Sequence, residues 1–375
     1  MKHLAHKHEI LWVSRQLESA ACSRSGFEAL GIRTMVVGKP VRKKSGPRFI
    51  LSLLGNTFSA DPYVVSSHRS KELRMTAQQM YQSLACDLIH CEWTPYAANM
   101  PQSLSCPTVG MAHNVESVVW RRYQQIEKNP LKKLYLGLQA NKMERFERQA
   151  LPRFNRVISV SDQDKKIISQ WVPSDRIAVV PNGVDMDFFH GESGHSSPDS
   201  LVFIGSLDWR PNVDCVIYFL DEIWPLIKNS FPEARLAVVG RNPLPGLASR
   251  VASEHSVTLH GSVDDVRPYI NSAQVCIVPL RIGSGSRLKI LEAFAMGKPV
   301  VSTSVGAEGL EVENGRQVLI ADNPADFADA VKRLFVDPAY RHSLAFEGRQ
   351  LAMEKYSWRI LAERLESEWQ RTIKT

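Results

Sequence analysis

Short, uniformly apolar runs alternate with amphipathic stretches along the second half of the chain. The runs are rich in β-branched residues and lack the in/out alternation of a half-exposed strand. They occupy residues 200–205, 235–240, 256–261, 274–280, 299–303 and 317–321. This pattern predicts strands that are buried on both faces and connected by helices, which is typical of a parallel, doubly wound sheet.

The first half of the chain has the same pattern less clearly. Its strands are expected at residues 9–14, 33–38, 86–92, 107–112 and 156–161. A polar segment rich in glycine and serine, 190–200, follows this half, and 375 residues suit two domains. We therefore expect an N-terminal domain over 1–189, a C-terminal domain over 190–356, and a final helix over 357–375 that packs back on the first domain.

Composition and missing motifs exclude several classes of protein. Hydrophobic residues make up 44% and charged residues 23%, as in soluble globular proteins, and no run is long and apolar enough to span a membrane. The six cysteines are scattered without a CxxC pair, and the first residues lack the apolar core of a signal peptide, so we expect a cytoplasmic protein. The motifs GxGxxG after a strand, GxxxxGK[ST] and GxSxG are missing, which argues against a nicotinamide oxidoreductase, a P-loop NTPase and a hydrolase.

Charge is distributed unevenly between the two halves. Residues 1–180 carry 26 Lys and Arg against 14 Asp and Glu, whereas residues 181–375 carry 20 against 25. The basic tract 118–148 contains apolar anchors between its cations: Trp120, Tyr123, Leu131, Leu134 and Tyr135. It is suited to an anionic membrane surface on the inner face of the membrane, or to a solvated helix that covers its own domain. Nucleic acid is not expected as a partner, because no recognised binding module accompanies the charge.

The most informative stretch is RIGSGSRLKILEAFAMGKPVVST, residues 281–303. A Gly/Ser-rich loop here enters a helix, so the amides of Gly285, Ser286 and Arg287 are expected to bind an anion. Arg287 and Lys289 add positive charge, and the Glu292 carboxylate can accept two hydrogen bonds from a ribose diol. The alternative is an ordinary capped helix with surface charges.

This stretch resembles the donor-binding signature of the family 4 glycosyltransferases, which are retaining enzymes of the GT-B fold. Further segments resemble the family: PNGVD at 181–185, GSLDWRPNVD at 205–214, the region 260–281, MAHNVESVVWRRY at 111–123, DLIHCEW at 87–93 and RVISVSDQDKK at 156–166. The resemblance covers most of the chain and is greatest with polysaccharide-associated bacterial sugar transferases. It implies an α/β protein with two Rossmann-like, doubly wound domains that face each other across a cleft.

The resemblance also implies an activity. It predicts transfer of a sugar from a nucleotide diphosphate sugar to a glycan or lipid-linked acceptor, with retention of anomeric configuration, in polysaccharide or cell-surface glycan synthesis. No cofactor and no metal are expected. Two alternatives remain open: a non-catalytic nucleotide-sugar-binding partner with an incomplete acceptor domain, and a nucleotide-sugar epimerase.

The family's residue roles transfer to this chain in part. Glu292 matches the second glutamate of the family's E-x7-E motif and would hold the donor ribose, but Ser284 stands at the place of the first glutamate. The family often has an arginine and a lysine near the first C-domain glycine, where this chain has Ser206 and roughly Pro211. We therefore expect Arg210, with Arg287 and Lys289, to neutralise the diphosphate.

The remaining expected contacts come from both domains. Ser284, Gly285, Ser286 and Gly205 are expected at the donor, and Gly240, Arg241 and Val263 resemble positions that flank the nucleotide base. His113 matches the N-domain histidine that reaches the sugar across the cleft, and a packed histidine at a strand end is the alternative. Asp185 and Asp187 form a DxD, but they lie in a turn between domains, where aspartate is common, so we expect no metal there.

The beginning of the N-terminal domain lacks one expected element. A domain of this kind begins with a central strand and a glycine-rich turn, whereas residues 3–14 resemble the end of the first helix and the second strand. We expect codons upstream of Met1 to encode the missing strand. Without it, the strands at 9–14 and 86–92 must pair with each other, take a substitute or leave a gap.

Overall fold

The chain divides into two compact units in a computed structural model that describes residues 1–15, 26–38, 46–191, 196–282 and 288–374. Unit 1 comprises Met1–Val180 and Ala362–Thr375, and unit 2 comprises Pro181–Leu361. The sequence placed the boundary at residues 189 and 190 instead. Residues just after Pro181 group with unit 2 because they pack there: the Val184 amide donates to the Tyr356 carbonyl at 2.8 Å, and Phe189 contacts the unit 2 core.

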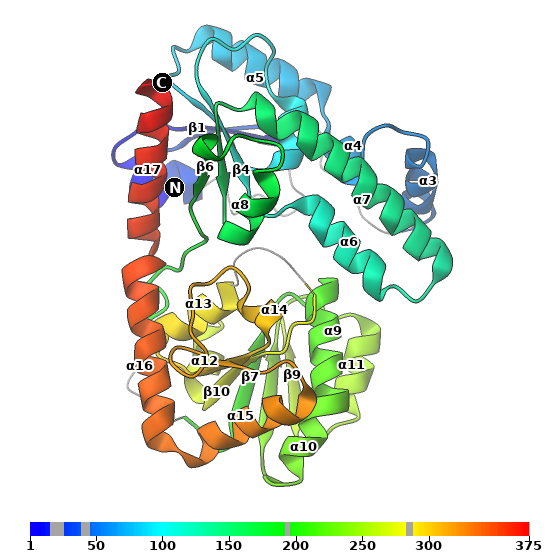
Figure 1. The fold of residues 1–375 in the computed structure, drawn as a ribbon, viewed down its shortest axis with the longest axis vertical. Coiled ribbons are helices and arrows are strands. Elements are labelled where there is room, and N and C mark those ends of the chain that lie inside the picture. Colours follow the sequence, from blue (N-terminus) through cyan, green and yellow to red (C-terminus); the bar gives the residue numbers. More distant parts are fainter. Residues whose placement is uncertain (16–25, 39–45, 192–195, 283–287, 375) are drawn as a thin grey trace. The chain divides into compact units, whose positions relative to one another are not determined.

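Unit 2 is built on a six-stranded parallel sheet (Figure 1). Its strands are β7 (Ser200–Ile204), β8 (Arg235–Val239), β9 (Val257–Gly261), β10 (Val275–Val278), β11 (Val300–Ser302) and β12 (Leu319–Ile320). The strand order is β12-β11-β10-β7-β8-β9. This confirms the predicted doubly wound sheet, and the order reverses between β7 and β10, where such sheets bind their ligands.

Helices follow the strands of unit 2 as the sequence pattern predicts. They are α9 (Arg210–Tyr218), α10 (Trp224–Lys228), α11 (Pro245–Ala252), α12 (Arg267–Ser272), α13 (Leu288–Ala295), α14 (Ser304–Ala307), α15 (Pro324–Val336) and α16 (Pro338–Lys355). A π-helical turn, Phe219–Ile223, joins α9 to α10. The start of α15 shows the local cause: Asn323 accepts the Asp326 amide, and Pro324 occupies the first turn.

The core of unit 2 lies between this sheet and its helices. Its largest buried side chains are aromatic: Trp224, Tyr356, Phe203, Phe219, Phe294 and Phe327. Burial of each such side chain stabilises the fold by roughly 1.5–3 kcal/mol. The sheet that carries the loops of the site is therefore held by a continuous core.

The main sheet of unit 1 has four parallel strands in the order β3-β4-β5-β6. They are β3 (Ile89–Cys91), β4 (Thr108–Ala112), β5 (Arg156–Ser159) and β6 (Ile177–Val179). The helices of the unit are α1 (Lys2–Ala5), α3 (Pro47–Asn56), α4 (Tyr63–His68), α5 (Lys71–Ser83), α6 (Glu116–Ile126), α7 (Pro130–Ala150), α8 (Asp162–Ile168) and the 3-10 turns Thr94–Asn99, Leu151–Arg153 and Ser174–Arg176. The sequence pattern did not indicate β6, which is only three residues long.

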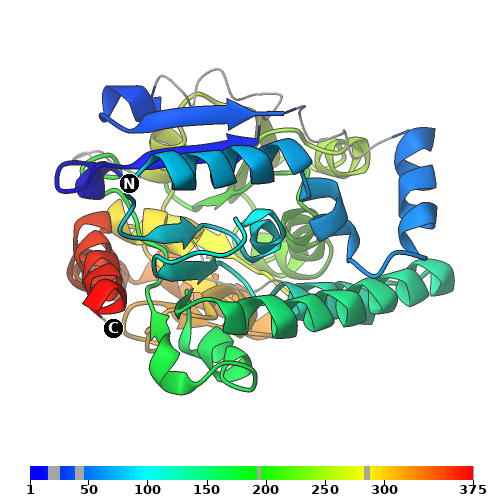
Figure 2. The same cartoon turned by 90° about the horizontal axis from the view of Figure 1, so that it is seen from above.

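Two further strands of unit 1 form a sheet of their own. Strands β1 (Leu11–Arg15) and β2 (Arg33–Val37) pair in parallel and appear side by side in Figure 2. Within the described residues, β1 has no ladder with β3, so the strands expected at 9–14 and 86–92 belong to separate sheets. Every residue of β1 is only half-buried, although its sequence is largely apolar. Among the strands that the structure describes, this arrangement corresponds to a gap, one of the three expected outcomes.

The last helix, α17 (Trp358–Lys374), enters unit 1 at Ala362. Within unit 1, the Trp369 indole donates to the His90 ring at 2.9 Å, and Glu366 pairs with Lys7 at 2.7 Å. Glu368 forms an ion pair with Arg156 at the start of β5. Side chains near the end of the chain thus contact strands of the four-stranded sheet.

Candidate functional site

The loops that carry the predicted donor residues leave the sheet of unit 2 at one edge. Gly205 follows β7, Gly240 follows β8 and Val263 follows β9, while the Gly/Ser-rich segment follows β10. Because all these strands are parallel, their carboxyl ends lie at the same edge. The structure therefore brings Gly205, Gly240 and Val263 to the same edge of the sheet, which is the edge where open parallel sheets bind ligands.

Gly205 and Gly240 allow two of these loops to touch. A Cβ atom on Gly240 would lie 1.8 Å from the Gly205 carbonyl oxygen, and one on Gly205 would lie 2.6 Å from the Asn212 side-chain nitrogen. The Gly205 amide also donates to the Val239 carbonyl at 3.0 Å. A side chain at position 240 would therefore collide with the backbone of the loop after β7, and one at position 205 would collide with Asn212 of α9.

Glu292 lies on α13, in the helix that follows β10. Its side chain is half-buried, and the structure shows no hydrogen bond or ion pair to its carboxylate from the described residues. Burial raises the pKa of Glu292, and the charge of Lys289 opposes this only in part. A carboxylate of this kind is poised to accept hydrogen bonds from a ligand.

Lys289, one turn before Glu292, is held by the first helix of unit 2. Its Nζ donates to Asn212 Oδ1 at 2.7 Å and lies 4.5 Å from the centre of the Phe203 ring. Asn212 in turn donates to the Ser206 carbonyl at 2.9 Å. Lys289 is thereby fixed close to the loop after β7, where the sequence predicted cations for the diphosphate.

A polar network joins the loops after β7 and β8. Ser206 donates to Asp208 Oδ1 at 2.7 Å and accepts from Arg241 Nε at 2.9 Å. Asn242 donates to the other Asp208 oxygen at 3.2 Å. Burial raises the pKa of Asp208, but hydrogen bonds from Ser206 and Asn242 outweigh it and hold the pKa below its ordinary value. The exposed Arg241 is thus anchored beside Gly240.

The other predicted residues of unit 2 divide into two sets. Arg210 is exposed at the first position of α9, and Val263 packs partly against the core. The remaining predicted positions lie outside the described residues: Ser284, Gly285, Ser286 and Arg287.

The sequence analysis missed Arg281, which lies three residues after the end of β10. Its guanidinium makes two bonds to Asp214 of α9, at 2.6 and 3.1 Å, and its Cζ lies 4.3 Å from the Tyr218 ring centre. The hydrogen bond to Asp214 raises the pKa of Arg281. The partners are 67 positions apart, so no local sequence signal could reveal this pair.

In unit 1, His113 directly follows β4. Its Nε2 lies 3.1 Å from Oε1 of Glu92, the residue that follows β3. Burial lowers the pKa of His113, but the contacts with Glu92 outweigh it and raise the pKa above its ordinary value. Burial likewise opposes ionisation of Glu92, yet hydrogen bonds to His113 and His90 lower its pKa to about 2. Glu92 is a partner that the sequence analysis did not identify.

The DxD aspartates behave as turn residues in the structure. Asp185 Oδ1 accepts the amides of Asp187 and Phe188 at 3.0 and 3.1 Å, which is the geometry of an Asx turn. Across the described ranges, no group of three or more His, Cys, Asp or Glu side chains is arranged to hold a metal ion.

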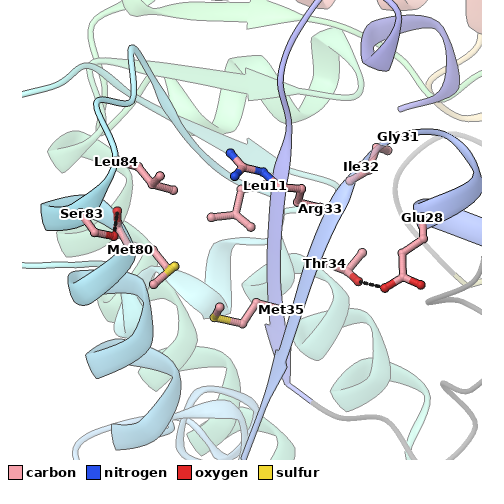
Figure 3. A pocket seen from close by; sticks show the side chains of 10 residues that line it. All are labelled: Leu11, Glu28, Gly31, Ile32, Arg33, Thr34, Met35, Met80, Ser83 and Leu84. Atoms are coloured by element: carbon pink, nitrogen blue, oxygen red, sulfur yellow. Dashed lines mark hydrogen bonds between the residues drawn. The ribbon is translucent and has the colours of Figure 1, made fainter.

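A pocket of about 640 Å³ lies elsewhere, in unit 1, between the β1–β2 sheet and α5 (Figure 3). Figure 3 shows Leu11, Met35, Met80 and Leu84 around its apolar interior. None of the described residues predicted for the site lines this pocket. Its apolar floor corresponds to the half-buried face of the two-stranded sheet rather than to a polar binding site.

Two family models match the chain and together cover most of it. Residues 23–188 match Glycosyltransferase Family 4, and residues 198–337 match Glycosyl transferases group 1. The chain belongs to the family 4 glycosyltransferases. The two matched regions correspond to the two halves in which the donor-binding and histidine motifs of the family were recognised.

Curated relatives of this family 4 chain are distant. An uncharacterized 44.6 kDa protein in the cps region of Klebsiella pneumoniae is 22% identical over 65% of this chain and 63% of its own length. A phosphatidyl-myo-inositol mannosyltransferase of Mycobacterium leprae is 27% identical over 56% of this chain and 57% of its own length. The chain thus matches about 60% of the length of these relatives.

Solved structures share the fold over nearly the whole chain. Sucrose-phosphate synthase from Thermosynechococcus elongatus has a TM-score of 0.69 at 16% identity, covering 98% of this chain and all of that chain. A glycosyltransferase from Rickettsia africae has a TM-score of 0.67 at 10% identity, with the same coverage. Anabaena HepE, crystallised with UDP and glucose, has a TM-score of 0.63 at 14% identity, covering 96% of this chain and 99% of that chain. The family 4 chain therefore has the α/β fold expected from its sequence.

Proposed function

We propose that the protein is a glycosyltransferase that moves a sugar from a nucleotide diphosphate sugar to a glycan or lipid-linked acceptor, with retention of anomeric configuration. The observation that carries this proposal is Glu292: a half-buried carboxylate without a partner among the described residues, at the ligand edge of a doubly wound sheet. Family membership supports the same reaction class.

The nucleoside and the diphosphate of the donor are assigned to two groups of residues. Glu292 accepts the ribose hydroxyls, while Gly240, Arg241 and Val263 flank the base. In this proposal the charges of Lys289, Arg210 and Arg287 neutralise the diphosphate, and the amides of Gly285 and Ser286 assist them. Because negative charge develops on the leaving diphosphate, fixed cations there stabilise the transition state and no metal is required.

The class of acceptor is inferred from the relatives. One is named a phosphatidyl-myo-inositol mannosyltransferase, and another is named for a cps region. A lipid-linked or polysaccharide acceptor for this chain, in bacterial surface glycan synthesis on the cytoplasmic side, is consistent with both names.

A donor screen followed by a transfer assay tests the proposal. Nucleotide sugars with uridine, guanosine and adenosine bases are ranked by thermal shift, and the best donor is then supplied with a labelled sugar and a bacterial glycolipid fraction. Label in the glycolipid, with the donor's anomeric configuration by NMR, supports the proposal. Inverted configuration contradicts retention, and epimerised donor without transfer would identify an epimerase.

A second candidate is a non-catalytic nucleotide-sugar-binding partner. The observation that favours it is that β1 and β2 form a sheet separate from the four-stranded sheet of unit 1 among the described strands. In the family that the chain resembles, this domain binds the acceptor. Donor binding without transfer or hydrolysis, in an assay supplied with lipid and glycan acceptors, would support this candidate over the enzyme.

We also propose that unit 1 binds peripherally to an anionic membrane surface, without crossing the membrane. No helix in the described ranges has the length and apolar composition to cross a membrane. The α6–α7 hairpin instead exposes Ile126, Leu131 and Leu134, of which Leu131 is 78% exposed. Cations surround these side chains on the same hairpin: Arg121, Arg122, Lys128, Lys132 and Lys133.

Helix α3 extends this apolar surface. It exposes Ile50, Leu51 and Leu54, and Phe58 just beyond it is 94% exposed. Lys142 of α7 donates to the Asn56 carbonyl at 2.7 Å, which ties the end of α3 to α7. Exposed apolar side chains next to lysine and arginine are typical of helices that lie in a membrane interface.

Replacing Leu131 and Leu134 together by aspartate is expected to weaken binding to anionic vesicles by about 10-fold or more. The reason is that the variant no longer buries two leucine side chains in the membrane interface. The new aspartates also repel the anionic lipid and oppose the attraction of the neighbouring basic residues, which is roughly 1 kcal/mol for each. Vesicle flotation at low and high salt measures the change in membrane binding. Val336→Asp, at an exposed apolar site of unit 2, is the matched control. Equal flotation of the wild type with neutral and anionic vesicles would contradict the proposal.

A further inference from the structure

Four side chains of unit 1 form a continuous polar chain that ends at His113. Trp369 Nε1 lies 2.9 Å from His90 Nδ1, and His90 Nε2 lies 3.2 Å from Glu92 Oε2. The other Glu92 oxygen lies 3.1 Å from His113 Nε2. The chain runs from α17 through the ends of β3 and β4, and His113 is its only member that the sequence analysis assigned to the reaction.

The direction of the first hydrogen bond determines the state of His90. An indole N–H can only donate, so His90 Nδ1 must be the unprotonated acceptor. Nε2 is therefore the ring nitrogen of His90 that carries a proton, and it lies 3.2 Å from Glu92 Oε2. His90 thus faces one oxygen of the Glu92 carboxylate, and its contact, like that of His113, lowers the pKa of Glu92.

His113 contacts the other oxygen of the Glu92 carboxylate. Glu92 contacts it through both the carboxylate and the backbone. The other charged groups near the pair are the Glu116 carboxylate, which acts on His113, and the Met1 amino group, which Glu92 affects. Glu116 has the same sign as Glu92, so both carboxylates favour the imidazolium form of His113.

We propose that Glu92 is a positioning residue that holds His113 as an oriented imidazolium for sugar transfer, and that His90 and Trp369 hold Glu92 in turn. This inference rests on the proposed function for the role of His113. A fixed imidazolium is a charged hydrogen-bond donor, which can stabilise negative charge that develops on a sugar or diphosphate oxygen. A neutral imidazole could not do so equally well.

The pair has a defined pH range. Glu92 is ionised above about pH 2, and the pKa of His113 is raised, so the pair persists until the pH rises through the raised pKa of His113. Function that needs the imidazolium is therefore present on the acid side of that pKa and is lost on the alkaline side.

An NMR titration of His113 tests the inference without requiring activity. The His113 ring signal is assigned by its loss in His113→Asn and followed with pH in the wild type, Glu92→Gln and Glu116→Gln. Glu92→Gln is expected to lower the pKa of His113 clearly, because it removes the contacting charge in a side chain of the same shape. Glu116→Gln, the matched control, is expected to lower it less, because Glu116 acts without that contact.

Kinetics on the same variants test the link to the reaction. In Glu92→Gln the alkaline limb of kcat/KM should move to lower pH, with about a 10-fold loss at pH 8, as expected for a lost charge-assisted hydrogen bond. The inference is overturned if wild-type His113 titrates at or below 6.5, a result that needs no variant. It is also overturned if Glu92→Gln leaves the titration or the pH profile unchanged. No transfer by the wild type would instead contradict the proposed function, and the titration would still decide the Glu92–His113 pair.

Discussion

Replacing Glu292 by alanine is expected to weaken binding of a nucleoside diphosphate, and of its sugar conjugate, by about 10- to 100-fold. Hydrogen bonds from ribose hydroxyls to a carboxylate contribute roughly 1.5–3 kcal/mol. Among the described residues, no donor already occupies the Glu292 carboxylate, so the variant would lose these bonds to the ligand. Calorimetry with UDP, GDP and ADP measures the loss. Equal losses for the diphosphate and the sugar conjugate would place Glu292 on the nucleotide rather than on the sugar.

Two companion variants sharpen this test. Glu292→Gln keeps the size but loses the charge, so an intermediate loss is expected. Glu233→Ala removes an exposed carboxylate just before β8, at the opposite edge of the same sheet, and should change nothing. Because burial raises the pKa of Glu292, wild-type affinity should fall as the pH drops through that raised value, whereas Glu292→Gln should lack this dependence. Unchanged affinity in a folded Glu292→Ala protein would refute the assignment.

Removing the charge of Lys289 should reduce turnover more than donor affinity. If the Lys289 ammonium acts on charge that develops as the diphosphate departs, Lys289→Ala should lower kcat by about 100-fold or more, with a smaller change in Kd. Arg287→Ala is expected to act in the same direction. Single-turnover kinetics at saturating donor, together with calorimetry, separate the two effects.

The Asn212 contact provides the control for this prediction. Asn212→Ala removes the side chain that binds Lys289 Nζ but keeps the charge, so it should cost less turnover than Lys289→Ala. Equal losses would mean that Lys289 only supports the loop. Activity is also expected to survive EDTA, because cations and helix amides neutralise the diphosphate. Strict dependence on a divalent metal would contradict this and direct attention back to Asp185 and Asp187.

Much of the local architecture could be predicted from the sequence because its causes are local. The apolar runs of the second half became β7 to β12, and Asn323 with Pro324 marked the start of α15. The segment 281–303 likewise indicated the donor motif from its residue types and spacing, and the family models agree. Strand identity, helix starts and the motif therefore needed no knowledge of distant contacts.

The contacts that shape the site have causes far apart in the chain, and only the tertiary structure decided them. Lys289 binds Asn212 across 77 positions, Arg281 binds Asp214 across 67, and His113 lies against Glu92 across 21. The sequence could suggest that β1 and β3 lack a common neighbour, but the structure showed that they lie in separate sheets. Periodicity and capping depend on residues a few positions apart, so the sequence alone determined the family and most of the elements, the short β6 excepted. Strand order and side-chain pairing depend on which elements pack together, so the burial of Glu292 and the partners of Lys289 and His113 emerged only from the folded chain.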